Sequence, residues 1–427
     1  MTRPDPYRPA LLSGPSGCGA DCTNAPNRVF LKRRATFLFA LAATASVLIG
    51  CAKRAATSPD LPPVPGIAGN QTLRLGDSVR AVLTRAIADS AFPGAYAAVG
   101  TADGVIVEYG VGRLDVADDT RPSASTIWDL ASLTKVIGTT SAMIQLVGSG
   151  RVALDSPVVR YLPAWKAPGA ERITVRHLLS HSSGMPAWRA LYKEAATPDE
   201  AERQLFATSP DTLPGVRYVY SDLGFILLGK LVERVSGERL AQYDSAHVFS
   251  PLGMTDTRYV PPASLLARIA PTEQDPWRQK KVRGEVHDEN AVRLGGVSGH
   301  AGLFSTGRDL ARFARMYLRR GTLDGVRVFD SVTVASFTRL QDSTISRRAL
   351  GWETPTGSNS AGGRLSPMAF GHTGFTGTSL WMDPAQGIFV LLLTNRVNPT
   401  RENRKIGGVR TALTDAAVGA LRGEPGR

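Results

Sequence analysis

The sequence has only three cysteines among its 427 residues. They are Cys18, Cys22 and Cys51, so none lies in the long stretch that follows position 51. That stretch therefore has no disulfide framework and no thiolate ligands for a metal ion. With 43% hydrophobic residues, the chain has enough apolar side chains to build one large globular domain or two smaller ones.

Two motifs of other hydrolases are also missing. No G-x-S-x-G occurs, which argues against the nucleophile elbow of α/β-hydrolases. His177 and His181 have a spacing that can bind metal, but Leu178 replaces the glutamate of H-E-x-x-H and no third ligand is evident. We interpret these histidines as structural, and we expect that the protein needs no metal or other cofactor.

The formal net charge is +13, but the basic residues form no dense block after the first fifty positions. No nucleic-acid-binding motif accompanies them, so we expect no nucleic-acid partner. Scattered positive charge is compatible with attraction to anionic membrane headgroups or wall polymers.

The first 50 residues have the layout of a secretory signal. Lys32-Arg33-Arg34 precedes an uncharged apolar run from Ala35 to Gly50. The alternative is an uncleaved anchor helix, although the run is short for a membrane span. Residues 51–70, rich in Ala, Ser, Pro and Gly, are expected to be a linker. Both interpretations place the rest of the chain outside the cytoplasm.

Helical and strand patterns alternate in a characteristic order after the linker. Helices are expected at Thr72–Ser90, Leu130–Gly150, Val175–Ser180, Asp222–Val235, Arg239–Phe249, Arg308–Tyr317 and Gly408–Leu421. Strands are expected in a hairpin at Ala95–Gly112 and at Ala349–Thr354, Gly371–Met382 and Gly387–Thr394. The fold class is therefore α/β (α+β), with an antiparallel sheet built from both ends of the chain.

This order predicts one domain over residues 71–425. Its sheet lobe would comprise residues 71–125 and 345–425, with helices against the sheet. Its helical lobe, residues 126–344, would be inserted between the two parts of the sheet. Functional sites commonly form where two such lobes meet.

The segment Leu130–Gly150 carries a single charge, Lys135, and has apolar residues at helical spacing. Ser132 lies three positions before Lys135, so the hydroxyl and the amine share one face of a helix. Burial shifts the pKa of a lysine downward, and such an amine can accept a proton from a serine. The pair is a candidate nucleophile and base; the alternative is a lysine that extends to solvent from the end of a core helix.

Two further segments are candidates for the same site. Tyr220 and Asp222 lie at the start of an expected helix. Tyr220 can relay protons there, and Asp222 can pair with Lys135. The alternative is an ordinary N-cap formed by Ser221 or Asp222. In Gly371–Gly377, glycines permit close approach of a ligand to the backbone, and the Phe375 N–H can face an oxyanion. The alternative there is a bulged strand that needs glycine for its geometry.

The motifs S-x-x-K, Y-S-D and H-T-G, in this order, resemble those of the penicillin-recognising serine hydrolases. The similarity is greatest to the branch of class C β-lactamases, low-molecular-weight penicillin-binding proteins and esterases, and it extends from about Gly69 to Leu421. It implies a β-lactamase-like fold. The end of the apolar run, Leu48-Ile49-Gly50-Cys51, resembles the lipobox of bacterial lipoproteins. That resemblance implies lipidation of Cys51 and a membrane-anchored protein on the periplasmic or cell-surface side.

The family resemblance also implies roles for the site residues. Ser132 would be acylated, Lys135 would activate it, and Tyr220 would share the proton transfers. The N–H groups of Ser132 and Phe375 would form the oxyanion hole. The residues expected to face the substrate are Asp222, His372, Thr373, Gly374 and Phe375.

Two positions depart from the family pattern. Asp222 stands where asparagine is usual, and His372 stands where a lysine usually attracts a substrate carboxylate. A histidine there argues against strict D-Ala-D-Ala or strong penicillin hydrolysis. We expect a lipid-anchored serine hydrolase that acts on cell-wall D-amino-acid peptides or related amides. The alternatives are a carboxylesterase on small esters and a catalytically inactive wall- or peptide-binding lipoprotein.

Overall fold

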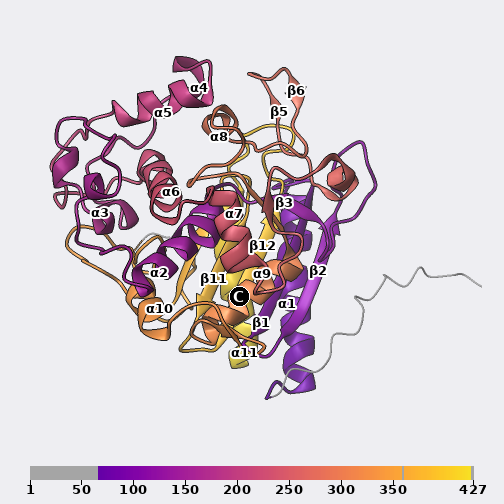
Figure 1. The fold of residues 1–427 in the computed structure, drawn as a ribbon. Helices are drawn as coiled ribbons and strands as arrows, with labels where there is room; N and C mark the ends of the chain where they lie inside the picture. The colour runs from indigo at the N-terminus through magenta and orange to yellow at the C-terminus, as the bar shows by residue number, and fades with distance from the viewer. Residues whose placement is uncertain (1–65, 358–359, 425–427) are drawn as a thin grey trace, which may run out of the picture. The chain divides into compact units, whose positions relative to one another are not determined.

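A five-stranded antiparallel sheet is the centre of the computed structural model, which describes residues 66–357 and 360–424 (Figure 1). Its strand order is β10-β11-β12-β1-β2. The strands are β1 (Gly94–Thr101), β2 (Val105–Gly112), β10 (Phe370–Thr373), β11 (Ser379–Asp383) and β12 (Ile388–Thr394). β1 pairs with β12 from Ala95 opposite Thr394 to Thr101 opposite Ile388. The sheet thus joins early and late parts of the sequence, as predicted.

The side chains of β1 alternate between two hydrophobic cores. Ala95, Ala97 and Val99 belong to one core, while Tyr96 and Ala98 belong to the other. Successive strand residues point to opposite faces, so a strand buried on both faces has an apolar side chain at nearly every position. The first core lies under α1 (Gly69–Ala88) and α11 (Ile406–Arg422), which contact each other.

The second core connects the other face of the sheet to the inserted helices. α9 (Gly307–Leu318) contacts β1, β11 and β12 on that face. Figure 1 shows α2–α6 to one side of the main sheet. The remaining α-helices are α2 (Thr140–Gly148), α3 (Val175–Leu179), α4 (Leu191–Glu194), α5 (Pro198–Phe206), α6 (Asp222–Ser236), α7 (Leu240–Asp244), α8 (Glu289–Arg293) and α10 (Ser331–Thr338).

A small second sheet, which the sequence patterns do not predict, supports the candidate site. It has the order β3-β7-β4, with β3 (Ile127–Asp129), β7 (Leu303–Thr306) and β4 (Arg258–Tyr259). β3 ends three residues before Ser132, and β7 begins three residues after His300. Two more hairpins are formed by β5 (Gln274–Asp275) with β6 (Lys280–Lys281), and β8 (Thr322–Leu323) with β9 (Val326–Arg327).

Two expected strands are wrong. Ala349–Thr354 forms no strand: Gly351 has φ +83°, and only isolated bridges join Glu353 to Arg348 and Gly371. Its apolar residues reflect burial and not extended backbone. Gly371–Met382 is not one strand but two, because a turn closes where the Gly374 N–H donates to the Thr378 carbonyl.

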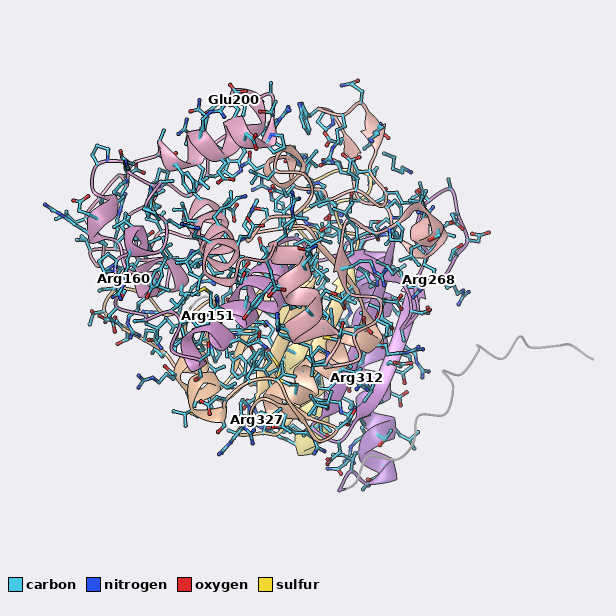
Figure 2. The ribbon with its side chains drawn as sticks, viewed as in Figure 1. Arg151, Arg160, Glu200, Arg268, Arg312 and Arg327 are labelled. Carbon is cyan, nitrogen blue, oxygen red and sulfur yellow. The ribbon has the colours of Figure 1, made fainter. Side chains whose placement is uncertain are left out.

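Charged side chains extend from many parts of the fold; Arg151, Arg160, Arg312 and Arg327 are examples (Figure 2). None of the helices in residues 66–357 and 360–424 combines the length and apolarity needed for a membrane span. Cys51 and the predicted signal segment lie outside the described residues.

Candidate active site

The backbone around Ser132 is helical but is not the single α-helix that the sequence predicts. A 3₁₀ turn (Ala131–Leu133) leads into a π-helical turn (Lys135–Thr139) and then into α2. Ala131 has φ +46°, a value that is unfavourable for residues with a β-carbon. Such outliers and π-turns are frequent at functional sites, where surrounding contacts hold them. Here the Asp129 carboxylate accepts the Ala131 N–H at 2.8 Å.

The ammonium of Lys135 is fully buried and has three acceptors. Its Nζ lies 3.0 Å from Ser132 Oγ, 3.1 Å from the His300 carbonyl oxygen and 2.7 Å from Asp222 Oδ1. The first two contacts are hydrogen bonds that Nζ donates, and the third is an ion pair. The alternative of a lysine that reaches solvent is excluded by the 0% exposure of its side chain.

The pKa of Lys135 shifts in the direction opposite to the one expected from burial. Burial does lower this pKa, but the Asp222 carboxylate, together with Tyr220, outweighs it and raises the pKa above the usual value. Lys135 is therefore an ammonium at neutral pH. The expected downward shift of the Lys135 pKa is wrong, because a carboxylate stands at position 222 in place of the usual asparagine.

Tyr220 and Asp222 reach the lysine from the N-terminus of α6. The Ser221 hydroxyl caps this helix by accepting the Gly224 N–H at 3.1 Å. The N-cap is thus real, but Ser221 forms it, and the Asp222 side chain is free to pair with Lys135. The Lys135 Nζ lies 5.0 Å from the centroid of the Tyr220 ring. The structure therefore brings Ser132, Lys135, Tyr220 and Asp222 together.

His372 and Thr373 end β10 beside Tyr220. The rings of His372 and Tyr220 have centroids 6.0 Å apart. The His372 Nδ1 lies 2.8 Å from the Thr373 carbonyl, so it is the protonated nitrogen, and the buried Nε2 has no hydrogen-bond partner among the described residues. Burial, with Arg348 and Lys135 nearby, holds the pKa of His372 well below its usual value. The imidazole is neutral.

The turn Gly374–Thr378 is bonded to the backbone that precedes Ser132. The hydroxyls of Thr376 and Thr378 donate to the carbonyls of Asp129 at 2.7 Å and Leu130 at 3.0 Å. The backbone N–H of Phe375 donates no hydrogen bond to another described residue. This N–H is available to an oxyanion on a substrate bound at Ser132.

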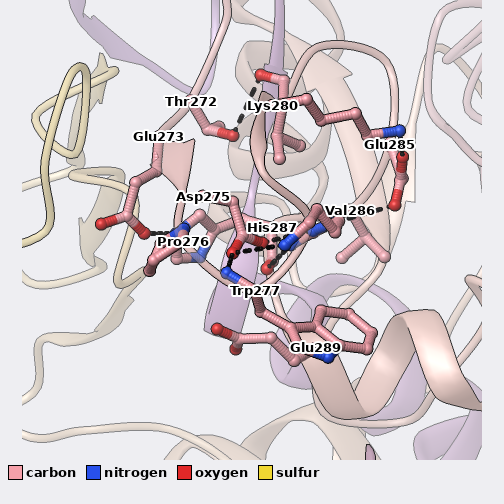
Figure 3. A network of polar contacts seen from close by, with 12 residues as sticks. Thr272, Glu273, Asp275, Pro276, Trp277, Lys280, Glu285, Val286, His287 and Glu289 are labelled. Atoms are coloured by element: carbon pink, nitrogen blue, oxygen red, sulfur yellow. Dashed lines mark hydrogen bonds and ion pairs between the residues drawn. The ribbon is translucent and has the colours of Figure 1, made fainter.

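A segment rich in ion pairs, drawn in Figure 3, contacts this turn through His287 and Phe375. Arg278 pairs with Asp275 and Glu285, and it also donates to the carbonyls of Val286 and His287. The ring of His287 stacks on Phe375 with centroids 5.7 Å apart. These contacts fix one wall of the site beside Phe375.

Several residues of the site are not recognisable from motif spacing. His181, interpreted above as structural, lies against Tyr220 with ring centroids 4.5 Å apart and accepts the Ser221 N–H through Nδ1 at 3.0 Å. His177, in contrast, accepts the Thr174 N–H at the start of α3, which is a structural role. Arg348, 5.1 Å from the Tyr220 ring centroid, has no local sequence signal.

Within the described residues, no three His, Cys, Asp or Glu side chains are grouped to hold a metal ion. The described site contains a hydroxyl, a buried ammonium and a phenol, with the free backbone N–H of Phe375 nearby. This set can activate a serine and stabilise an oxyanion.

Comparison with known proteins gives one consistent family. A model of the family described as Beta-lactamase matches residues 79–413. An N-acetylmuramyl-L-alanine amidase of Bacillus subtilis (strain 168) is 35% identical over 306 residues, which are 64% of this chain and 68% of the relative. A protein of Salmonella schwarzengrund (strain CVM19633), provisionally named a D-alanyl-D-alanine carboxypeptidase, is 31% identical over 68% of this chain and 74% of its own. Among solved structures, a penicillin-binding protein homologue from Caulobacter crescentus has a TM-score of 0.67 at 22% identity, covering 83% of this chain and 99% of its own.

Proposed function

Because this chain belongs to the beta-lactamase family of serine hydrolases, we propose that it cleaves amide bonds of cell-wall peptides through an acyl-enzyme on Ser132. The observation that carries the proposal is the 3.0 Å contact between Ser132 Oγ and a fully buried ammonium of Lys135. By their names, these relatives act on an N-acetylmuramyl-L-alanine amide and on a D-alanyl-D-alanine peptide.

The hydrogen bond from Lys135 to Ser132 supports a direction for the first proton transfer. Since Nζ donates to Ser132 Oγ, the hydroxyl proton of Ser132 points to another acceptor. We infer that Tyr220, whose ring centroid lies 5.0 Å from the same ammonium, takes this proton. Lys135 then stabilises the negative charge that develops on Ser132 Oγ, while Asp222 keeps the Lys135 amine protonated.

The reaction has two steps. In the first, Ser132 Oγ bonds to the substrate carbonyl carbon, the C–N bond breaks, and the serine proton passes by way of Tyr220 to the leaving amine. In the second, water adds to the acyl carbon, a proton of that water passes by way of Tyr220 to Ser132 Oγ, and the C–O bond to Ser132 breaks. In each step the N–H groups of Ser132 and Phe375 bind the oxyanion.

A carboxylesterase on small esters is the second candidate, and the neutral His372 favours it. An alkoxide leaving group needs less protonation than an amine, and many small esters carry no carboxylate for a cationic third motif to bind. Hydrolysis rates rank the amidase and esterase activities. The substrates to compare are a D-Ala-D-Ala peptide, an N-acetylmuramyl-L-alanine amide, nitrocefin and a p-nitrophenyl ester.

Covalent labelling tests the assignment of Ser132 directly. We expect a fluorophosphonate to add one label to the wild type and none to Ser132→Ala, as measured by intact-protein mass. Ser149→Ala, just after α2, is the matched control and should label like the wild type. Labelling of Ser132→Ala equal to that of the wild type would contradict the proposal; a wild type that neither labels nor turns over any substrate would favour the inactive binding protein.

We also propose that Cys51 anchors the protein to the membrane on the periplasmic or cell-surface side. The basic cluster, the apolar run and the residues before Cys51 support this. Expression of the full precursor and of Cys51→Ala, followed by membrane fractionation and mass spectrometry of the N-terminal peptide, tests it. An unmodified, soluble wild-type product would contradict it.

A further inference from the structure

Three aromatic side chains, Trp188, Tyr192 and Trp277, form a cluster on the surface that the acylation machinery does not use. Trp188 and Trp277 are 47% and 37% exposed. The centroid of the Tyr192 ring lies 6.3 Å from that of Trp188 and 4.9 Å from that of Trp277. The other tryptophans of the chain are at most 1% exposed: Trp128, Trp165, Trp352 and Trp381. Exposed aromatic side chains that gather in one place mark a binding surface.

Backbone hydrogen bonds hold this aromatic cluster in place from separate segments of the chain. Trp277 lies in the turn between β5 and β6, where its backbone N–H donates to the Asp275 carboxylate at 2.7 Å (Figure 3). The backbone N–H of Tyr192, in α4, donates to the Asn290 side chain in α8 at 3.0 Å. In Figure 1, α4, α8 and the β5–β6 hairpin lie in the upper part of the view. The rings therefore stand on fixed backbone.

On one side, the aromatic cluster adjoins the residue that pairs with Lys135. The Ala187 carbonyl accepts the backbone N–H of Asp222 at 2.9 Å. Trp188 is the next residue along the chain, so its backbone is one peptide away from this hydrogen bond. The Trp188 ring is thus anchored beside the start of α6, which carries Asp222 to the Lys135 ammonium.

On another side, the aromatic cluster is linked to the turn that offers the oxyanion donor. Arg278 follows Trp277 and donates to the His287 carbonyl. The His287 ring in turn stacks on Phe375 with centroids 5.7 Å apart. The aromatic cluster therefore continues from the wall of the candidate site and does not form an isolated surface patch.

The arrangement of the rings suits a sugar. The faces of aromatic rings carry partial negative charge, which attracts the weakly positive C–H bonds on one face of a pyranose. The three rings are tilted by 54° and 73° to their neighbours, so they present separate faces. Cationic groups of Lys193 and Arg278 lie 5.6 Å and 5.7 Å from the Tyr192 and Trp277 ring centroids. An open border of this polarity suits hydroxyl and amide groups, whereas an aliphatic acyl chain favours an enclosed apolar pocket.

We propose that the aromatic cluster binds a pyranose ring of a cell-wall glycan that is attached to the acyl group transferred to Ser132. This inference rests on the proposed function and deepens it, because it selects those cell-wall amides whose acyl part carries a sugar. In an N-acetylmuramyl amide, a short lactyl ether joins the sugar ring to the scissile carbonyl. The sugar of such a substrate must lie next to the serine, where the aromatic cluster begins.

The test compares two substrates that differ in the sugar alone. One is N-acetylmuramyl-L-alanine, and the other is O-methyl-lactyl-L-alanine, which keeps the ether and the scissile amide. We expect the wild type to prefer the sugar substrate in kcat/KM. The ratio of the two kcat/KM values should fall about 3- to 10-fold in Trp188→Leu and in Trp277→Leu, the range for one aromatic contact. Because the readout is a ratio, a general loss of activity does not change it.

Two variants are controls for this ratio. Trp277→Phe keeps an aromatic face and should retain most of the preference, whereas leucine keeps apolar area without such a face. Leu73→Ala removes an apolar side chain of α1 that is 72% exposed, and it should keep the wild-type ratio.

Tryptophan fluorescence provides a second measurement that needs no turnover. Because the other four tryptophans are buried, a sugar on the aromatic cluster changes the emission of Trp188 and Trp277. We expect N-acetylmuramic acid to cause a saturable change in the wild type and none in Trp188→Phe/Trp277→Phe.

The outcomes separate this inference from the proposed function. A wild type without label on Ser132 contradicts the proposed function, and the fluorescence titration then decides the sugar site by itself. A labelled, active wild type with equal kcat/KM for the two substrates overturns the sugar site alone. A wild-type ratio in both leucine variants overturns it as well.

Discussion

The Asp222 carboxylate lies 2.7 Å from the ammonium of Lys135, at the position where the family usually has an uncharged asparagine. This pair sets the protonation state of the site. Burial lowers the pKa of Lys135, but Asp222 and Tyr220 raise it by more. We therefore propose that Lys135 donates to Ser132 and stabilises negative charge, rather than accepting the serine proton.

Asp222→Asn removes the charge while it keeps the shape of the side chain. Without the Asp222 carboxylate, burial is the larger effect on the Lys135 ammonium, so the pKa of Lys135 falls. We expect the alkaline limb of the pH–rate profile for Ser132 acylation to move to lower pH, because the site needs the ammonium. The measurement is the fluorophosphonate labelling rate as a function of pH.

Asp155→Asn is the control for this experiment. It breaks an ion pair of Asp155 with Arg176, where the aspartate is 75% exposed. Its profile should match that of the wild type. A shift of the acidic limb alone in Asp222→Asn would show that neutral Lys135 is the base and would contradict our assignment.

The sequence predicts the parts of this site that are local and fails where distant segments meet. Ser132 and Lys135 are recognisable because three residues along a helix bring two side chains to one face. The sheet is recognisable because a strand buried on both faces, such as β12, is continuously apolar. Arg348 has no such signal, since its partners Tyr218 and Tyr220 are about 130 residues away. The direction of the Lys135 pKa depends on Asp222, which only the fold brings near.

Gly374→Ala is expected to displace the oxyanion-binding turn. A β-carbon at Gly374 would lie 2.3 Å from the Leu130 carbonyl oxygen and 2.1 Å from Thr378 Oγ1. The Leu130 backbone precedes the nucleophile and cannot retreat without moving Ser132. We expect kcat to fall about 10²- to 10³-fold, the usual effect of losing one oxyanion donor.

Steady-state kinetics and thermal unfolding of this variant are measured together. Gly408→Ala, in α11, is the control, because a β-carbon there meets no atom within 4 Å. It should retain wild-type kcat. A folded Gly374→Ala with wild-type kcat would show that the Phe375 N–H does not bind the oxyanion.

Acid should destabilise the fold through two buried histidines. Burial first, and then the positive charges of Arg348 and Lys135, hold the pKa values of His181 and His372 well below 6.5. As the pH falls below about 6.5, the unfolded chain binds protons that the folded one does not. The free energy of unfolding therefore decreases by up to about 1.4 kcal/mol per pH unit for each histidine.

Denaturant unfolding between pH 7.5 and 5.5 measures this slope, in a range where exposed carboxylates stay ionised. We expect His181→Gln to reduce the slope by one proton. His247→Gln removes an imidazole that is 44% exposed and is the control for the substitution itself. A slope that is the same in the wild type and in His181→Gln would contradict the prediction.

Arg410 is expected to orient the Phe375 N–H from behind the turn. Its Nη2 donates to the carbonyls of Gly374 at 2.6 Å and Thr378 at 2.8 Å. The Gly374 carbonyl and the Phe375 N–H belong to one planar peptide, and in a trans peptide the two groups point in opposite directions. A guanidinium that holds the carbonyl therefore turns the N–H towards the opposite side. We expect Arg410→Met to lower kcat/KM about 10- to 100-fold, part of the cost of losing an oxyanion donor.

If Arg410 were merely structural, Arg410→Met would lower the stability of the protein without changing how tightly the enzyme binds the transition state. We therefore expect a boronic acid that forms a tetrahedral adduct on Ser132 to lose affinity in Arg410→Met by the same factor as kcat/KM. Arg404→Met, at an exposed position just before α11, is the matched control and should change neither. If folded Arg410→Met binds the boronic acid as tightly as the wild type, Arg410 does not orient this peptide, because a misdirected N–H cannot stabilise the tetrahedral oxyanion.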